Sequence, residues 1–252
     1  MSRRVRLLNG RFDPLTQAQT VDAVFAMISE RVRGWLCTVN VSTLMAMRAD
    51  PWLQTFVDRA ALVVADGQPL VWSAPLFGGR LPERVAGIDL IDDLCGRAEA
   101  TGTGVYLLGS TSTALAMAMS NLRGRYPGLR LDGADGYFAA ADAPVRADEI
   151  RASGAGLLLV GMGSPRQDEF IFQQWERLGA IVAIGVGGSF DVLAGLRWRA
   201  PRWVRHAGME WAIRLVQEPR RLLPRYLSSN TLFCALIARQ LFSGRTRRAE
   251  SD

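Results

Sequence analysis

LLLVGMGSPRQDEF, residues 157–170, passes from a near-continuous apolar run into an amphipathic segment within a few residues. The run LLLVGMG (157–163) has the length and composition of a strand that is buried on both faces. The segment at 166–178 has the spacing of a helix, so the strand turns directly into it. This arrangement is typical of α/β proteins, in which helices cover a parallel sheet.

The same alternation extends in both directions along the first 190 residues. Helical patterns at 17–31, 42–60, 88–101, 111–125 and 144–153 separate further short apolar runs. Those runs are WLCTVNV (35–41), ALVVAD (61–66), VYLLGS (105–110), LRLDGA (129–134) and IVAIGVG (181–187). We therefore predict a parallel sheet covered by helices, preceded by a small hairpin at VRLLNGRFDPLT, where Asn-Gly lies between two short runs.

Charge divides the chain near residue 196. Residues 1–196 contain 18 arginines against 20 acidic residues, a net charge of −2, whereas residues 197–252 contain 12 arginines against 4, a net charge of +8. The stretch RWRAPRWVRHAGMEWAIRLVQEPRRLLPRY (197–226) also holds three tryptophans. We predict a body at 1–196 and an Arg/Trp-rich appendage at 197–252 that binds an anionic partner.

Targeting signals are not evident. The N-terminal MSRRVRLLNGRFDP lacks an apolar signal-peptide core, and no run reaches the roughly 18–20 apolar residues that span a bilayer. The three cysteines lie far apart and are odd in number, which favours a reducing cytoplasm. Any membrane contact is therefore expected to be peripheral.

Polar residues follow the first two main strands of the predicted sheet. Thr38 and Asn40 end the strand at 35–41, and either they bind a sugar or base, or they cap the next helix in competition with Ser42 and Thr43. Asp66, followed by glycine, is placed for general-base chemistry, although Asp-Gly is also ordinary turn material.

Arg84 lies in the polar segment GGRLPERVAGIDL (78–90), which follows soon after Asp66 in the chain. In this segment, the Arg84 guanidinium could either bind a phosphate or form a surface salt bridge.

Two glycine-rich loops follow the last two strands. In GMGSPRQDE (161–169), Gly161, Gly163 and Ser164 precede a helix whose first turn carries Gln167 and Asp168. In GVGGSFD (185–191), Gly187 allows close backbone approach and Ser189 and Asp191 offer polar contacts. One such loop is an ordinary tight turn, but two on consecutive strands favour nucleotide or phosphate binding.

Missing residue types remove several mechanisms. His206 is the only histidine and lies outside the α/β body, which disfavours Ser-His-Asp and histidine–metal chemistry, and the chain has no lysine for a P-loop. A carboxylate base that works without a metal is the chemistry that remains.

Two other classes of protein stay in view. A nucleic-acid-binding module could use the Arg/Trp segment, but the body is net acidic and shows no known binding motif. A nucleotide-dependent oxidoreductase would need the glycine fingerprint and acidic ribose partner that this chain lacks. We therefore expect no nucleic-acid partner.

In combination, TVN, VADGQPLVW, GRLPERVAGIDL, GMGSPRQDEF and GVGGSFDVLAGLRWRAPRWVRHAGMEWAIRLVQEPRRLLPRY resemble the WecG/TagA/CpsF glycosyltransferase family over residues 8–228. The resemblance implies a Rossmann-like parallel-sheet body with helices on both faces and a basic helical C-terminal appendage. It also implies inverting transfer of a sugar from a UDP-sugar to a polyprenyl-pyrophosphate-linked saccharide, with no metal and no cofactor. Such an enzyme would work at the cytoplasmic face of the bacterial inner membrane, in peripheral contact with it.

The resemblance assigns roles to individual residues. Asp66 corresponds to the proposed base, Thr38 and Asn40 to the family's T-x-N motif, and Gln167 to the glutamine of its PRQE motif, where this chain has Asp168 and then Glu169. The tail arginines of the family fall on Arg214, Arg221 and Arg225, which would bind the acceptor pyrophosphate, with Trp203 at the membrane interface. The donor sugar, the acceptor glycan and any assembly into homo-oligomers stay open.

Overall fold

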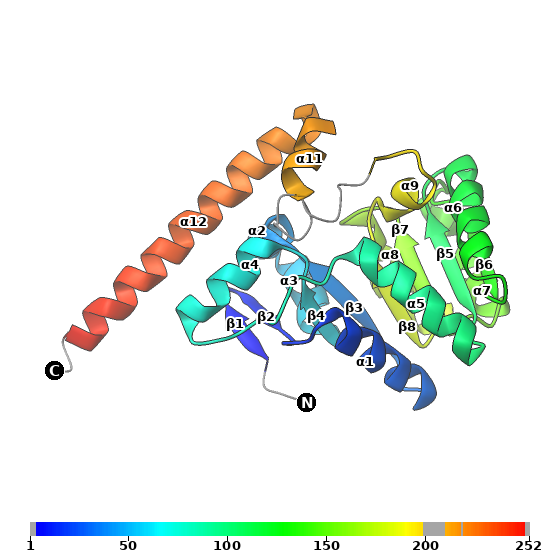
Figure 1. The fold of residues 1–252 in the computed structure, drawn as a ribbon, viewed down its shortest axis with the longest axis horizontal. Helices are drawn as coiled ribbons and strands as arrows, with labels where there is room; N and C mark the ends of the chain where they lie inside the picture. Colours follow the sequence, from blue (N-terminus) through cyan, green and yellow to red (C-terminus); the bar gives the residue numbers. More distant parts are fainter. Residues whose placement is uncertain (1–3, 199–209, 218, 250–252) are drawn as a thin grey trace.

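A six-stranded parallel sheet forms the centre of the body, in the order β4-β3-β8-β7-β5-β6 (Figure 1). The computed structural model describes residues 4–198, 210–217 and 219–249. The strands are β3 (Gly34–Val39), β4 (Leu62–Ala65), β5 (Val105–Gly109), β6 (Leu131–Ala134), β7 (Leu157–Gly161) and β8 (Val182–Gly185). All six predicted strands are confirmed, and all pair in parallel.

Helices connect these strands and cover both faces of the sheet (Figure 1). They are α1 (Gln17–Ser29), α2 (Val41–Ala49), α3 (Pro51–Asp58), α4 (Gln68–Ser73), α5 (Gly87–Thr101), α6 (Ser112–Arg125), α7 (Ala143–Ala152), α8 (Arg166–Leu178) and α9 (Ser189–Leu193), with 3₁₀ turns η1 (Ala74–Phe77) and η2 (Ala140–Asp142). The predicted α/β body is thus confirmed.

The single helix predicted at 42–60 is wrong, because two helices occupy it. Asp50 ends α2 in an extended conformation, and its carboxylate accepts hydrogen bonds from the backbone of Trp52 at 2.9 Å and Leu53 at 3.4 Å, which caps α3. Pro51 at the first position of α3 has no N–H to continue the previous helix, but its fixed φ suits a helix start. The short helices α4 and α9 were also not predicted, because each is a single turn or little more.

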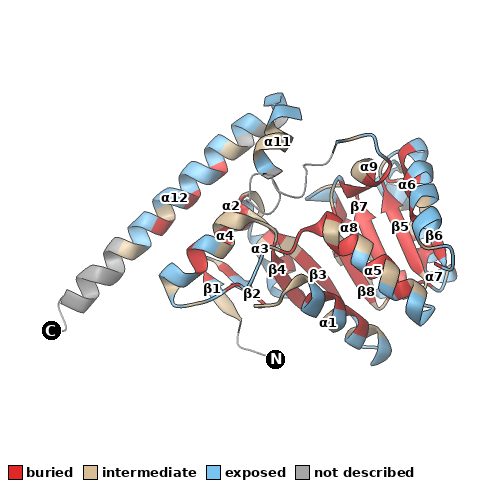
Figure 2. Cartoon of the chain, viewed as in Figure 1, coloured by how far each residue is buried: buried red, intermediate tan, exposed pale blue. Residues whose placement is uncertain are grey.

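Alternating side chains of the strands enter two hydrophobic layers, one on each face of the sheet. On β3, Cys37 belongs to the layer covered by α2, α3, α7 and α8, whereas its neighbour Leu36 belongs to the layer covered by α1, α5, α6 and α9. All five residues of β5 and of β7 are buried (Figure 2). Full burial on both faces explains why these strands are continuous apolar runs rather than alternating ones.

The predicted hairpin is confirmed as β1 (Val5–Leu7) paired antiparallel with β2 (Gly10–Phe12). Leu7 and Phe12 are fully buried in the layer of α2 and α3. Asp13, just after β2, accepts the backbone N–H of Val63 on β4 at 2.8 Å and pairs with Arg4 at 3.0 Å. The hairpin is therefore fixed to the edge of the main sheet.

The C-terminal region contains α11 (Glu210–Gln217) and α12 (Pro219–Ala249). Helix α12 runs along the side of the body and packs on α2, and most of its described side chains are exposed (Figures 1 and 2). Phe233 and Ile237 of α12 are buried in the layer of α2, each worth about 1.5–3 kcal/mol. Pro224 lies inside α12, early in the helix. The predicted helical appendage is confirmed, while its boundary at 196/197 stays a prediction.

Within the described residues, no helix is long and apolar enough to cross a membrane.

Candidate functional site

Asp66 and Asn40 lie side by side where β4 and β3 end. Val39 pairs with Ala65 in the sheet, and the backbone N–H of Asp66 donates to the carbonyl of Val39 at 2.9 Å. A Cβ on Gly67 would lie 3.8 Å from Asn40. The sheet register therefore brings together the two strand ends that the sequence singled out, with Asp66 half-buried between them.

Asn40 caps α2. Its Oδ1 accepts the backbone N–H of Thr43 at 3.0 Å and the Thr43 hydroxyl at 3.3 Å. Of the two interpretations left open by the sequence, capping is therefore realised, and Asn40 rather than Ser42 or Thr43 does it. Contact between Asn40 and a sugar stays a prediction, and it would have to use the remaining amide group.

Gln167 joins the two glycine-rich loops. Its Oε1 accepts the backbone N–H of Gly163 at 3.2 Å and that of Gly187 at 3.0 Å. The side chain is only 7% exposed, and its Nε2 lies 2.4 Å from where a Cβ on Gly185 would stand. Hydrogen bonds thus join the predicted site residues Gly163, Gln167 and Gly187, and the buried Gln167 side chain positions the two loops relative to each other.

The glycines of these loops have different structural roles. A Cβ on Gly161 would lie 2.6 Å from the ring of Phe190, so this glycine allows two elements of the protein to pack closely. Gly163 (φ +78°) and Gly187 (φ +56°) have the left-handed conformation that favours glycine, and a Cβ on either would meet no atom within 4 Å. Open space for a ligand thus borders Gly163 and Gly187 rather than Gly161.

Ser189 and Asp191 are engaged within the protein. The Ser189 hydroxyl, which is buried, donates to the carbonyl of Val186 at 2.6 Å. Asp191 accepts the Ser110 hydroxyl at 2.6 Å and pairs with Arg197 at 3.2 Å. A ligand contact through Asp191 stays a prediction and would have to share the carboxylate with these partners.

Arg84 lies beside the end of β4, because the next residue, Val85, donates its N–H to the carbonyl of Ala65 at 2.9 Å. Its Nη2 is 4.0 Å from the carboxylate of Asp89 in the first turn of α5, and both side chains are largely covered. A Cβ on Gly87, where α5 begins, would lie 3.9 Å from the Thr38 hydroxyl. The polar segment that contains Arg84 therefore borders the same strand ends.

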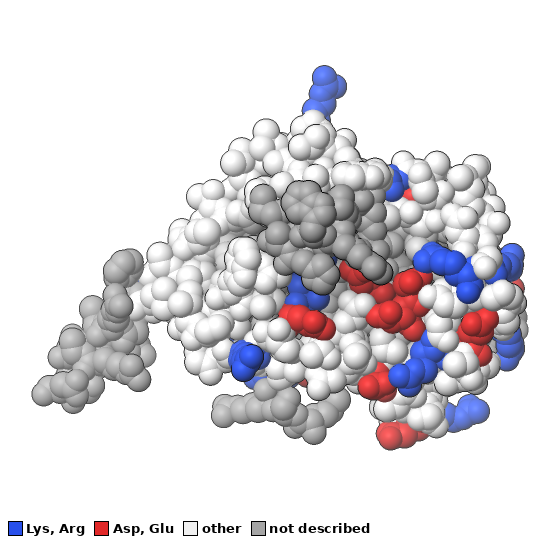
Figure 3. Space-filling view, in the orientation of Figure 1, with Lys and Arg blue, Asp and Glu red and all other residues white. Residues whose placement is uncertain are grey.

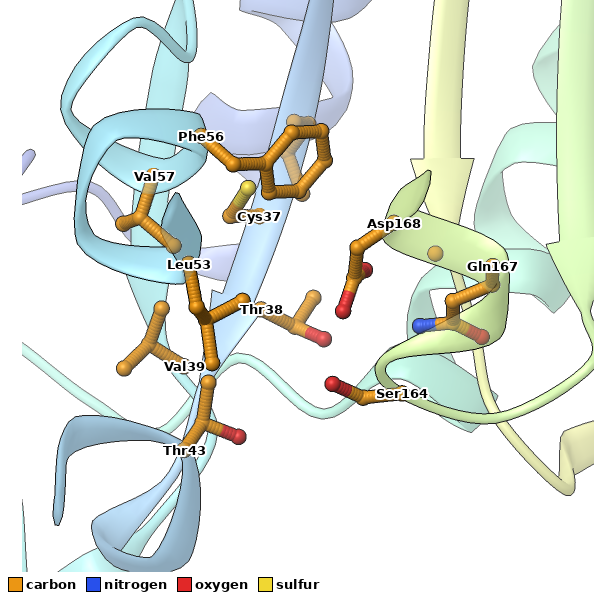
Figure 4. A pocket seen from close by; sticks show the side chains of 12 residues that line it. Cys37, Thr38, Val39, Thr43, Leu53, Phe56, Val57, Ser164, Gln167 and Asp168 are labelled. Carbon is orange, nitrogen blue, oxygen red and sulfur yellow. The ribbon is translucent and has the colours of Figure 1, made fainter. Parts of the chain in front are cut away.

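Oxygen atoms of Thr38, Ser164 and Asp168 point into one small cavity of about 40 Å³ between β3 and α8 (Figure 4). Asp168 is 8% exposed, and burial raises the pKa of its carboxyl group from 3.8 to about 6, against the hydrogen bonds from Ser164 and Gln167 that lower it. This cavity has room for a few waters but not for a sugar ring. Thr38 and Ser164, two of the predicted site residues, thus line the same cavity.

Asp168 received no role in the sequence-based site, although its position in the first turn of α8 was noted. The apolar residues Phe170, Ile171 and Leu178 of α8 are buried, and at helical spacing they place Gln167 on the buried face as well. The buried polar pair Gln167 and Asp168 at the start of this helix was the available signal.

Arg214 lies on α11, and Arg221 and Arg225 lie on α12. Their side chains, and the whole of Trp203, lie outside the described residues. Among the described residues, no group of three or more histidine, cysteine or acidic side chains is placed to hold a metal ion. The acceptor-binding role of the arginines and the metal independence stay predictions.

Residues 5–247 match the model of the glycosyl transferase WecG/TagA/CpsF family. The match covers the six-stranded body together with α11 and most of α12, and it includes all four strand-end loops described above. The chain therefore belongs to the WecG/TagA/CpsF family of UDP-sugar-dependent glycosyltransferases, which act on lipid-linked acceptors in the synthesis of cell-surface polymers.

Proposed function

We propose that this glycosyltransferase inverts the anomeric centre and moves a hexose, an N-acetylhexosamine or its uronic acid from a UDP-sugar to a polyprenyl-pyrophosphate-linked saccharide, without a metal. The reaction would contribute to a bacterial surface polysaccharide. One observation carries this proposal: the ends of β3, β4, β7 and β8 bring a carboxylate, Asp66, to the same sheet edge as two glycine loops joined by Gln167. Ligands of open α/β sheets bind at this edge.

In this mechanism, Asp66 is the general base. An acceptor hydroxyl attacks the anomeric carbon from the side opposite UDP, a new carbon–oxygen bond forms, and the bond to the UDP oxygen breaks with its electron pair leaving on UDP. Asp66 takes the hydroxyl proton as the bond forms, a role worth about 10²–10⁴ in rate. Thr38 lies on the neighbouring strand and would orient the acceptor or donor hydroxyls.

Stabilisation of the departing UDP falls to the glycine loops and to Arg84. Gln167 already uses the N–H groups of Gly163 and Gly187, so it positions the loops rather than binding phosphate through those groups. Other backbone groups of the loops and the Arg84 guanidinium, which also pairs with Asp89, would contact the diphosphate. Fixed donors of this kind stabilise developing charge without reorganisation.

Exposed apolar side chains on α11 and α12 support peripheral contact with the inner membrane from the cytoplasmic side. Trp211 is 45% exposed and contacts Tyr226 edge-on within the appendage, while Val216, Leu223 and Leu227 are 79%, 45% and 61% exposed. Indole and aliphatic groups next to arginines suit the lipid interface, where each arginine near anionic lipid adds about 1 kcal/mol.

The described charges on the face drawn in Figure 3 give little support to nucleic-acid binding. On the face drawn in Figure 3, acidic side chains gather near the middle, over the region of α5, and the basic ones lie among and around them. A nucleic-acid site would instead need a continuous basic stripe.

A UDP-release assay tests the proposed function. Purified protein is given a panel of UDP-hexoses and a synthetic prenyl-pyrophosphate-linked sugar, with and without EDTA. Acceptor-dependent UDP release from one donor, unchanged by EDTA, is the expected result, and analysis of the product by NMR gives the anomeric configuration. Release that EDTA abolishes would contradict metal independence, and a retained configuration would contradict inversion.

A further inference from the structure

A groove of about 460 Å³ runs between α2, α12 and the turn at Ser164–Pro165. We refer to it as the α2–α12 groove. Its volume lies within the range of about 300–1,000 Å³ that small-molecule sites occupy. No role described above uses it.

The appendage supplies one wall of this groove, and that wall is anchored to the body. The hydroxyl oxygens of Ser42 on α2 and Ser229 on α12 lie 3.0 Å apart in a hydrogen bond. One and two turns further along α12, Phe233 and Ile237 are buried in the layer of α2. The groove is therefore formed within a single chain.

The groove's lining fits a neutral saccharide. Hydroxyl groups of Thr43, Ser164 and Ser228 lie along it, next to apolar surface from α2 and α12. Thr43 donates to Asn40 at 3.3 Å, so its oxygen keeps a lone pair that can accept a hydrogen bond from a sugar hydroxyl, while the Ser228 hydroxyl donates to the carbonyl of Pro224 at 2.9 Å. Apolar surface suits the C–H faces of a sugar ring.

The described lining residues of the groove favour a neutral ligand over a phosphate. Among the described residues that line it, none is basic, and Asp50 is the one acidic side chain. That carboxylate already accepts two backbone N–H groups as the cap of α3. Among the described lining residues, a diphosphate would find no cation.

The groove leads toward the reacting groups. It shares Thr43, Leu53 and Ser164 with the small cavity that contains Thr38 and Asp168. That cavity admits a hydroxyl group or a few waters, whereas the groove admits a sugar ring. A ring in the groove can therefore direct one hydroxyl past Thr43 toward the end of β3, where Asn40 and Asp66 lie.

The position of the groove on α12 distinguishes the acceptor from the donor. Leu227, one of the exposed apolar residues on the helix proposed to face lipid, immediately precedes Ser228 in the groove wall. A saccharide attached to a lipid reaches the body from that side, while the nucleotide of the donor is expected at the glycine loops.

We propose that the α2–α12 groove binds the saccharide of the lipid-linked acceptor, with Thr43, Ser164 and Ser228 as its hydroxyl contacts. This assignment rests on the proposed function. It makes the appendage a part of the acceptor site within the same chain, and it makes Ala46 and Ser228, on opposite walls, determinants of which sugar fits.

Filling the groove tests the assignment. Ala46 lies on an exposed position of α2 and lines the groove, so Ala46→Trp should block it without disturbing the core. Ala49→Trp, on the same helix but outside the groove, is the matched control. Ser228→Phe fills the groove from α12, with Thr231→Phe, exposed and outside the groove, as its control.

The expected result is an acceptor KM raised at least tenfold by Ala46→Trp and by Ser228→Phe, with the UDP-sugar KM and the UDP Kd from calorimetry changed less than twofold. Both controls should resemble the wild type, and circular dichroism and Tm should show all four variants folded. An unchanged acceptor KM in both groove variants overturns the assignment while leaving the proposed function intact. An equal rise in the donor KM also overturns it, because the donor sugar would then occupy the groove. A wild type without acceptor-dependent UDP release refutes the proposed function, and the groove assignment fails with it.

Discussion

The side-chain oxygen of Gln167 accepts the backbone N–H of Gly187 at 3.0 Å, across the gap between α8 and the loop after β8. The same oxygen holds Gly163, so a single buried amide fixes the separation of the two glycine loops. The shape of the proposed diphosphate site therefore depends on a residue that the ligand need not touch.

We expect Gln167→Leu to leave the N–H groups of Gly163 and Gly187 without their acceptor. A fully buried unsatisfied donor costs roughly 1–3 kcal/mol, and these two are part-buried, so the free energy of unfolding should fall by about 1–3 kcal/mol in total. The Kd for UDP should rise as the loops shift. Urea unfolding and calorimetry measure the two effects, with exposed Gln173→Leu on the same helix as control. Wild-type stability and UDP affinity in Gln167→Leu would contradict the role of this amide.

Asp66→Asn should lower kcat by roughly 10²–10⁴, because the amide cannot take the acceptor proton. The fold and the Kd for UDP should stay near those of the wild type. The UDP-release assay measures the rate, and Asp132→Asn, at an exposed position on β6, is the control. Near-normal turnover by folded Asp66→Asn would refute its assignment as the base.

Asp168 should make the protein less stable as the pH rises from about 4 to about 6. Burial raises the pKa of this carboxyl group from 3.8 to about 6 in the folded protein, so the folded state binds the proton more tightly than the unfolded chain does. The stabilising contribution is thus fully present below about pH 4 and is lost as the pH rises through about 6; it is on the order of 3 kcal/mol.

Asp168→Asn carries no proton to lose and should lack this part of the pH dependence, so that it exceeds the wild type in stability above about pH 6. Urea unfolding between pH 4 and 8 measures the difference, with exposed Glu176→Gln on the same helix as control. Parallel curves for the wild type and Asp168→Asn would contradict the shifted pKa.

Two glycines three positions apart should respond differently to substitution by alanine. A Cβ on Gly185 would stand 2.4 Å from the Gln167 amide nitrogen, so Gly185→Ala should destabilise the protein by about 1–3 kcal/mol. Gly188 has a φ of −79°, and a Cβ added to it would meet no atom within 4 Å. The free energy of unfolding of Gly188→Ala should therefore lie within about 0.5 kcal/mol of the wild-type value. Thermal and urea unfolding compare them, and equal effects would contradict the packing around Gln167.

Leu223→Asp combined with Leu227→Asp should weaken binding to vesicles that contain anionic lipid. Both side chains are exposed, so the fold should survive, whereas their acidic replacements would face the lipid surface. Co-sedimentation measures binding. The double variant Ala235→Asp and Ala238→Asp, which adds the same charge at exposed positions of α12, should bind more strongly than the leucine variant. Equal loss in both would show that charge alone, and not these apolar contacts, decides binding.

The strands of the sheet could be predicted from the sequence, because strands buried on both faces, such as β5 and β7, consist of unbroken apolar runs. Helix boundaries were predicted where they depend on such runs. The break between α2 and α3 was missed because the apolar spacing continues across it, although the capping aspartate and the following proline decide the backbone there.

The site was predicted less completely than the fold. Strand ends are local features, so Asp66, Asn40 and the glycine loops could be found one by one. The hydrogen bonds that Gln167 accepts from both loops, the small cavity around Asp168 and the contact between Ser42 and Ser229, 187 positions apart, depend on tertiary packing. No local pattern encodes these contacts.

The order of the strands in the sheet determines when each strand can pair during translation. Strand β3 pairs with β4 on one side almost as soon as both have left the ribosome, but its other neighbour, β8, begins at Val182, 143 positions after β3 ends at Val39. At about 5–20 residues per second, one edge of β3 waits roughly 7–30 s for its partner during translation. Thr38 and Asn40 lie at the end of that waiting strand, and the glycine loop after β8 reaches them last. The proposed catalytic centre is therefore among the final parts of the body to assemble, and until then the edge of β3 that faces β8 stays unpaired.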